Sequence, residues 1–236
     1  MNIGLLQCDH VAERFQHITG DYPEMFSAVF GARFNLIPYD VCNGVWPTLV
    51  DDCDAYLCTG SRWSVYEDVG WIHDLKTFVR QLHAANKPFI GICFGHQMMA
   101  EALGGKVEKS AYGWGVGIQS VEITRPEPWM QPEQTTLKLH YMHQDQVTRL
   151  PENSVVWGRS EHCPVAAYRI GATMLGIQAH PEFTNEYSAA LLTDRIARIG
   201  AERVERARAS LVHRTDENVF AQWVAEFLTQ TTSAVP

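Results

Sequence analysis

Cys93 is the residue of this chain whose surroundings most clearly indicate chemistry. It lies in Gly91-Ile92-Cys93-Phe94-Gly95, between an apolar run and a helical pattern. Glycines two residues before and two residues after a cysteine let a strand turn sharply into a helix, and such a turn exposes the side chain at its apex. The positive end of the helix dipole then favours the thiolate, which is the reactive form. The alternative is a small buried thiol, which would need neither glycine.

A second motif offers the proton transfers that a thiolate needs for acyl transfer. The segment Gln178-Ala179-His180-Pro181-Glu182 follows an apolar run at 174–177, so we expect His180 at the end of a strand. A histidine can take a proton from the thiol and give one to a departing amine. Residues two apart on an extended segment project to the same side, so Glu182 could orient the imidazole. Taken alone, His-Pro-Glu is a weak signal, because a surface turn would look the same.

The elements that must position these residues alternate between strands and helices. Apolar runs predict strands at 2–7, 34–39, 55–58 and 89–93. Helical spacing of apolar residues predicts helices at 21–30 and 71–85, and a third that begins after Cys93 and ends at Gly104-Gly105. This alternation predicts an α/β domain with a central, mostly parallel sheet flanked by helices, in which ligands collect at the carboxyl ends of the strands.

From Lys106 onward the pattern changes to shorter, more alternating segments. We expect antiparallel strands that extend the sheet at 118–124, 136–141, 154–159, 165–169 and 174–178. Helical patterns follow at 187–199, 202–212 and 218–229. We therefore expect a single domain over residues 1–236, with a catalytic core of about 1–184 and a helical C-terminal extension of about 185–236.

The composition excludes several classes of function. The formal net charge of −8 leaves no extended basic face, so we expect no nucleic acid partner. We find no signal peptide and no apolar stretch of membrane-spanning length, and we expect a cytoplasmic protein that works on small molecules, with its six cysteines reduced. His140 and His143 are three residues apart but have no convincing third ligand, so we expect no metal and no other cofactor.

Together, the two motifs resemble those of the class I glutamine amidotransferases, which have a flavodoxin-like fold. The resemblance covers most of the chain. It rests on Thr59-Gly60-Ser61, on Cys93 with Gln97, on Met142-His143-Gln144-Asp145-Gln146-Val147, and on His180-Pro181-Glu182. It implies that Cys93 is the nucleophile, that His180 is the general base and acid, and that Glu182 orients His180.

The same resemblance implies further roles around these three residues. The backbone amides of Phe94 and of the Gly60-Ser61 turn, most of all that of Ser61, would form the oxyanion hole. Gln97 and the segment His143-Gln144-Asp145 would bind the amino-acid head of the substrate. Two positions depart from the family pattern, because Arg62 replaces a proline and Gln144 replaces a glycine. Both are expected at the rim of the substrate site, so they bear on which substrate is accepted.

Three functions remain open at this point. The first is a free-standing hydrolase of γ-glutamyl amides, since several segments look like the stand-alone family members, which include proteins similar to the glutaminase half of GMP synthase and plant γ-glutamyl peptidases. The second is a glutaminase subunit that delivers ammonia to a separate synthase. The third is a non-catalytic thiol protein that senses stress or oxidants. Trp114, within a glycine-rich loop, could either cap a substrate pocket or pack in the core.

Overall fold

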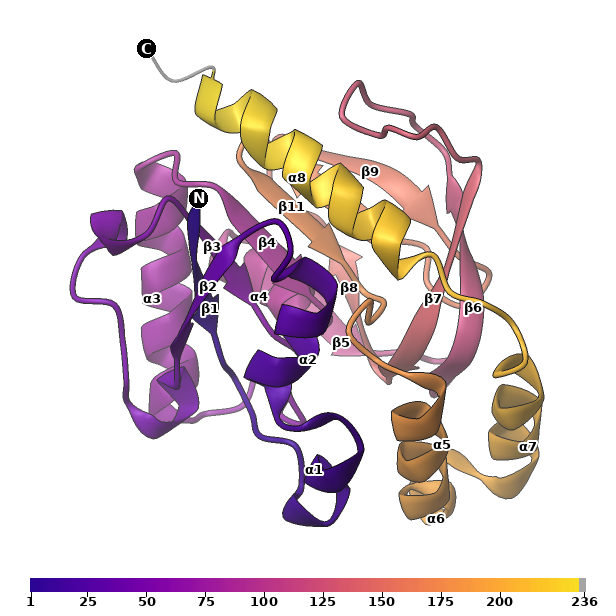
Figure 1. Cartoon of the computed structure of the whole chain (residues 1–236). Coiled ribbons are helices and arrows are strands. Elements are labelled where there is room, and N and C mark those ends of the chain that lie inside the picture. Colours follow the sequence, from indigo (N-terminus) through magenta and orange to yellow (C-terminus); the bar gives the residue numbers. More distant parts are fainter. Residues whose placement is uncertain (234–236) are drawn as a thin grey trace.

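Five parallel strands form one side of a nine-stranded sheet, in the order β2-β1-β3-β4-β11 with β2 at the edge (Figure 1). They are β1 (Asn2–Leu6), β2 (Asn35–Tyr39), β3 (Ala55–Cys58), β4 (Phe89–Ile92) and β11 (Met174–Ile177). In this computed structural model, which describes residues 1–233, every residue of β3, β4 and β11 is buried. Strands covered on both faces are apolar throughout, which is why continuous apolar runs located them in the sequence.

Antiparallel strands extend the sheet on one side, in the order β11-β10-β9-β6-β7. They are β10 (Ala167–Ile170), β9 (Ser154–Arg159), β6 (Gly115–Ile123) and β7 (Thr136–His143). The predicted extension is therefore confirmed. A separate two-stranded sheet pairs β5 (Lys106–Lys109) with β8 (Asp145–Arg149). We did not predict β5 as a strand, because three of its four residues are charged and only Val107 is buried.

One predicted strand direction is wrong, and the correction matters for the site. The strand at 174–178 was expected among the antiparallel strands, but β11 pairs in parallel with β4 and antiparallel only with β10. Its side chains are covered on both faces, as in the other central strands, although a hairpin from β10 leads into it. Because Ile177 is paired with Ile92, the residues that follow β11 leave the sheet beside Cys93.

Helices cover both faces of the sheet. On one face lie α3 (Gly70–Ala84) and α4 (Phe94–Ala102), whose apolar residues share one core cluster. On the other face, α2 (Tyr22–Phe30) and the long α8 (Glu217–Ser233), which crosses the strands in Figure 1, belong to a second cluster. There, Trp223 of α8 packs edge-on against Trp129 and Trp157. The C-terminal helix thus contributes directly to the core.

The remaining helices lie beyond the carboxyl ends of the parallel strands (Figure 1). They are α1 (Glu13–Thr19), α5 (Asn185–Asp194), α6 (Ile196–Ile199) and α7 (Ala201–Ser210). Single 3-10 turns follow β2 at Val41–Asn43 and precede β3 at Val50–Asp52. The sequence did not indicate α1, which has no buried residue. The helix expected at 187–199 is broken at Arg195. The sequence did not indicate this break, because the apolar spacing continues across it.

The expected C-terminal extension is helical as far as the structure describes it. Residues 234–236 of that extension lie outside the described residues. Among residues 1–233, none of the helices combines the length and the apolar character that crossing a membrane requires.

Candidate active site

Cys93 lies at the sharp turn between β4 and α4. Its backbone has φ 49° and ψ −96°, a conformation that non-glycine residues rarely adopt. The Cys93 N–H donates to the Ile177 carbonyl at 2.9 Å, and the Cys93 carbonyl accepts from the Gln97 N–H at 3.0 Å. A strained backbone persists only where its surroundings fix it, and these bonds to β11 and α4 do so here.

The two glycines around Cys93 allow this turn to pack closely. A Cβ atom on Gly91 would lie 2.5 Å from the Gly95 carbonyl, and a Cβ atom on Gly95 would lie 2.6 Å from the Cys58 carbonyl oxygen. Backbone atoms cannot move aside for such contacts without opening the turn. The close approach that we inferred from the sequence is therefore present.

His180 and Glu182 follow β11 on an irregular segment at the same edge of the sheet. The His180 N–H donates to the His140 carbonyl at 2.8 Å, and the His180 Nδ1 lies 2.7 Å from the Glu182 Oε1. The ring of Phe183 stacks on the imidazole with the ring centroids 4.0 Å apart. The side chains of His180 and Glu182 are 4% and 0% exposed, so their pairing takes place away from water.

The turn after β3 brings His180 and Cys93 to one place. A Cβ atom on Gly60 would lie 2.9 Å from the His180 Cε1 and 3.7 Å from the Cβ of Cys93. Both side chains therefore lie against the backbone of Gly60, although 87 residues separate them in the sequence (180 minus 93). The parallel pairing of β4 with β11 is the reason that the two chain segments meet.

The charge state of His180 follows from these neighbours. Burial lowers the pKa of His180, but the negative charges of Cys93 and Glu182, with their hydrogen bonds, outweigh burial and raise it to about 10. His180 therefore carries a proton near pH 7. By contrast, burial lowers the pKa of His140 to about 4 and that of His143 to about 3, so both rings are neutral near pH 7.

Two turns beside Cys93 carry the backbone N–H groups that we predicted for the oxyanion hole. Phe94 is the first residue of α4, and the N–H groups of a first helical turn have no intrahelical acceptor. On the turn after β3, the Arg62 N–H already donates to the Asp9 Oδ2 at 2.8 Å, whereas the Ser61 hydroxyl donates to the Cys8 carbonyl at 2.9 Å. These bonds fix the turn and leave the amides of Gly60 and Ser61 as the candidates that we predicted.

A cavity of about 200 Å³ opens beside Cys93. The predicted residues Ser61, Gln97, His143, Gln144 and Asp145 all line it together with Cys93. Gly60, Phe94, His180 and Glu182 are not among the lining residues. Trp114 also lines the cavity, which agrees with the pocket alternative for this residue, and Arg62 lies at the rim as the sequence suggested.

Hydrogen bonds hold the predicted substrate-binding residues in place. The Gln97 amide nitrogen donates to the Asp145 carbonyl at 2.9 Å and to the Gln178 Oε1 at 3.0 Å, so only its oxygen remains for a ligand. The Asp145 carboxylate accepts from the hydroxyls of Ser64 and Tyr66. The backbone carbonyl of Gln144 accepts from Ser110 at 2.8 Å. An acidic group with fixed geometry thus faces the cavity.

Sequence reasoning missed Gln178, whose side-chain amide lies 3.5 Å from the Cys93 sulfur. Gln178 is two residues before His180, so the alternation that placed His180 and Glu182 on one side also applies to it. The alternation therefore predicted the side on which Gln178 lies. We did not include Gln178 among the site residues, because a glutamine side chain has no acid–base chemistry. Ser64 and Tyr66 were also missed, because nothing in the sequence indicates that they meet Asp145.

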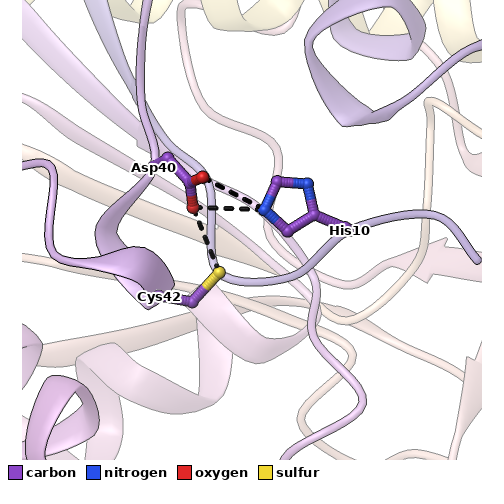
Figure 2. A group of neighbouring side chains, drawn as sticks. All are labelled: His10, Asp40 and Cys42. Carbon is purple, nitrogen blue, oxygen red and sulfur yellow. Dashed lines mark hydrogen bonds and ion pairs between the residues drawn. The ribbon is translucent and has the colours of Figure 1, made fainter.

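Within residues 1–233, one group of side chains has the residue types and closeness of a metal site, namely His10, Asp40 and Cys42 (Figure 2). The His10 Nε2 lies 3.2 Å from both Asp40 oxygens, and the Cys42 sulfur lies 3.3 Å from the Asp40 Oδ1. The His10 Nδ1 lies 2.6 Å from the Asp21 Oδ2. These hydrogen bonds and ion pairs account for the cluster without an ion, and it does not line the cavity beside Cys93. The absence of a metal stays a prediction.

Comparison with known sequences gives a consistent family. The model of the family described as glutamine amidotransferase class-I matches residues 36–198. The γ-glutamyl peptidase 3 of Arabidopsis thaliana is 30% identical over 193 residues, which cover 77% of this chain and 76% of that protein. The GMP synthase [glutamine-hydrolyzing] of Thermosipho melanesiensis is 34% identical over 149 residues, which cover 61% of this chain but 27% of the synthase.

Comparison with solved structures gives the same fold. A glutamine amidotransferase from Thermotoga maritima superposes with a TM-score of 0.74 at 18% identity, and the match covers 96% of this chain and 98% of that one. The fold predicted from the sequence is thereby confirmed.

Proposed function

The chain belongs to the class-I glutamine amidotransferase family, and we propose that it is a free-standing hydrolase of γ-glutamyl amides with Cys93 as its nucleophile. The observation that carries this proposal is the meeting of Cys93, which lines a cavity, with the buried His180–Glu182 pair. The similarity to a γ-glutamyl peptidase over three quarters of both chains supports the same substrate class.

The first half of the reaction forms a thioester. The Cys93 thiolate attacks the γ-carbonyl carbon, a C–S bond forms, and the carbonyl π electrons move to oxygen. The amides of Phe94 and of the Gly60-Ser61 turn stabilise the resulting oxyanion. When the oxyanion collapses, the C–N bond breaks and the His180 imidazolium gives its proton to the departing nitrogen. Ammonia or an amine leaves, and a γ-glutamyl thioester remains on Cys93.

The second half releases glutamate. A water molecule attacks the thioester carbon while neutral His180 takes its proton, and collapse of the second oxyanion breaks the C–S bond. Glu182 keeps the imidazole oriented and stabilises its charged form during both halves. Gln178 donates to the sulfur, which supports the thiolate as nucleophile and as leaving group.

The cavity offers partners for the glutamyl head. The Asp145 carboxylate, held by Ser64 and Tyr66, suits the α-ammonium group, because opposite charges attract strongly in a partly desolvated site. The oxygen of Gln97 is a further acceptor on the same side. These residues are the proposed substrate-binding residues, together with His143 and Gln144.

Release of glutamate from glutamine, γ-glutamylglycine and glutathione tests the proposal. Cys93→Ala and His180→Ala should each lower kcat/KM by at least roughly 10⁴-fold, since neither half-reaction can proceed without these groups. Cys42→Ala, which removes a thiol outside the cavity, serves as the control and should retain activity. In addition, mass spectrometry after acid quench should find one γ-glutamyl group on Cys93. Turnover at the wild-type level in either variant would refute the assignment.

The similarity to GMP synthase supports a second candidate, a glutaminase subunit that acts with a separate synthase. In that case the purified protein would hydrolyse glutamine slowly by itself, and affinity capture from the native cell extract would recover a synthase that raises its activity. Fast hydrolysis of γ-glutamyl compounds by the isolated protein would exclude this candidate.

A further inference from the structure

Three cationic side chains form the outer wall of the cavity beside Cys93. They are Lys109 of β5, Arg195 at the break between α5 and α6, and Arg198 of α6. Lys109 is far from the two arginines in the sequence, and none of the three belongs to the parallel strands. The small sheet and the C-terminal helices therefore bring three positive charges to the lining of a 200 Å³ cavity.

These charges differ from the other cations around the site. The Arg62 guanidinium is held by Asp9 at 2.6 Å, and the Arg14 guanidinium by Asp194 at 2.8 Å. Among the ion pairs within residues 1–233, none includes Lys109, Arg195 or Arg198. The chain has 27 acidic residues against 19 lysines and arginines, so a shortage of acidic partners does not explain the difference.

The two arginines also line a second cavity. A second cavity of about 180 Å³, lined by Tyr22 and Tyr187 among others, shares Arg195 and Arg198 with the first. The Arg198 guanidinium lies over the ring of Trp114, 5.4 Å from its centroid, and this contact holds it at the wall. There is thus room next to these cations for a leaving group larger than ammonia.

The lining of the first cavity carries charges of both signs. Asp145 and Glu67 suit an ammonium group, whereas the three cations suit an anion. Lys109 is the cross-strand partner of Asp145 in the β5–β8 pair, and the two arginines come from the C-terminal helices. The glutamyl head carries a single α-carboxylate, and the ammonia that leaves from glutamine is no anion, so glutamine offers one negative group to three cations. A leaving group that ends in a carboxylate, such as an amino acid or a short peptide, would pair with the arginines, whose planar fork matches a carboxylate.

We propose that Lys109, Arg195 and Arg198 form a carboxylate-binding subsite that selects γ-glutamyl compounds whose leaving group carries a carboxylate. This inference rests on the proposed function and specifies its substrate class. It assigns these three residues to specificity, not to the bond-breaking steps.

A matched pair of substrates tests the subsite. γ-Glutamylglycine and γ-glutamylglycinamide have the same glutamyl head and the same scissile bond, but only the first has a carboxylate on its leaving group. We expect the wild-type kcat/KM for the acid to exceed that for the amide by about tenfold or more, as is typical of a charge-assisted hydrogen bond. In Arg195→Ala/Arg198→Ala this ratio should fall toward one.

The design separates the possible failures. Because both substrates are assayed on the same preparation, partial unfolding of the variant leaves the ratio unaffected. Arg208→Ala, which removes an arginine paired with Glu205 on α7, is the control and should keep the wild-type ratio. Arg198→Lys, which keeps the charge, should retain more of the preference than Arg198→Ala.

Three results would overturn the inference. Equal wild-type rates on the acid and the amide would remove the subsite and leave the proposed function intact. An equal loss on both substrates in the double variant would show that the arginines bind the glutamyl head instead. If the wild-type protein hydrolysed neither compound nor glutamine, the proposed function would fail as well.

Discussion

The two walls of the cavity are built in different ways. On the inner wall, Cys93 lines the cavity, and His180 lies against the same turn at Gly60. Both residues follow buried parallel strands, and hydrogen bonds fix their backbone or side-chain atoms. On the outer wall, Lys109 and Arg198 are exposed, come from the small sheet and a short C-terminal helix, and have no carboxylate partner among the described residues. This difference shows that the parallel core fixes the reacting groups. Peripheral elements can therefore change which substrate is accepted without displacing the reacting groups.

Glu182→Gln tests the inner wall most severely, because it removes a buried negative charge beside His180. We expect kcat/KM to fall by roughly 10³-fold, since the imidazole loses both its orientation and the stabilisation of its charged form. Glu182 raises the pKa of His180, so its loss should lower that pKa. His180 must be protonated to act as the acid, and wild-type activity should decline as the pH rises through about 10.

The alkaline limb of the pH–rate profile in Glu182→Gln should therefore move to lower pH than in the wild type. Glu186→Gln, a change at an exposed residue of α5, is the control for the loss of one negative charge. An alkaline limb that stays in place would mean that Glu182 does not act on the protonation of His180. Such a result would also favour the thiol-sensing alternative, which has no need of this carboxylate.

Gly60→Ala should have a smaller effect on the same wall. The new Cβ atom would lie 2.9 Å from the His180 Cε1, so the imidazole must move by several tenths of an ångström. A displacement of this kind in a reacting group can lower kcat by about 10²-fold. Gly70→Ala is the matched control, because a Cβ atom there meets nothing within 4 Å. If both variants kept wild-type kcat, the inner wall would be less rigid than we infer.

Much of the inner wall could be predicted from the sequence. Apolar runs located the parallel strands, because strands buried on both faces need apolar side chains throughout. The glycines around Cys93 and the segment from His180 to Glu182 are local motifs, so their residues could be identified without knowing the fold. The direction of β11 could not be predicted in this way, since it depends on a pairing with β4, 85 residues away between Met174 and Phe89 (174 minus 89).

The outer wall could not be predicted. Lys109 belongs to a short strand with little apolar character, and Arg195 lies at a helix break that the apolar spacing does not reveal. Their convergence depends on how α5, α6 and the small sheet pack at the edge of the core, and no local pattern records such packing. Gln178 is an intermediate case, because its side of the strand was predictable and its contact with the sulfur was not.

The unusual backbone of Cys93 has a consequence for the folding equilibrium. A residue other than glycine held at such angles costs about 1–3 kcal/mol, and the native state must offset that amount elsewhere. The free energy of unfolding of Cys93→Gly should therefore exceed that of Cys93→Ala by about 1 kcal/mol, although both variants lack the thiol. Cys93→Gly should accordingly unfold at a higher denaturant concentration. Equal midpoints would show that the turn is relaxed. If the difference is found, the native fold is less stable with a cysteine at position 93 than it would be with a glycine there. The protein then gives up part of its stability to hold its reactive sulfur at this turn.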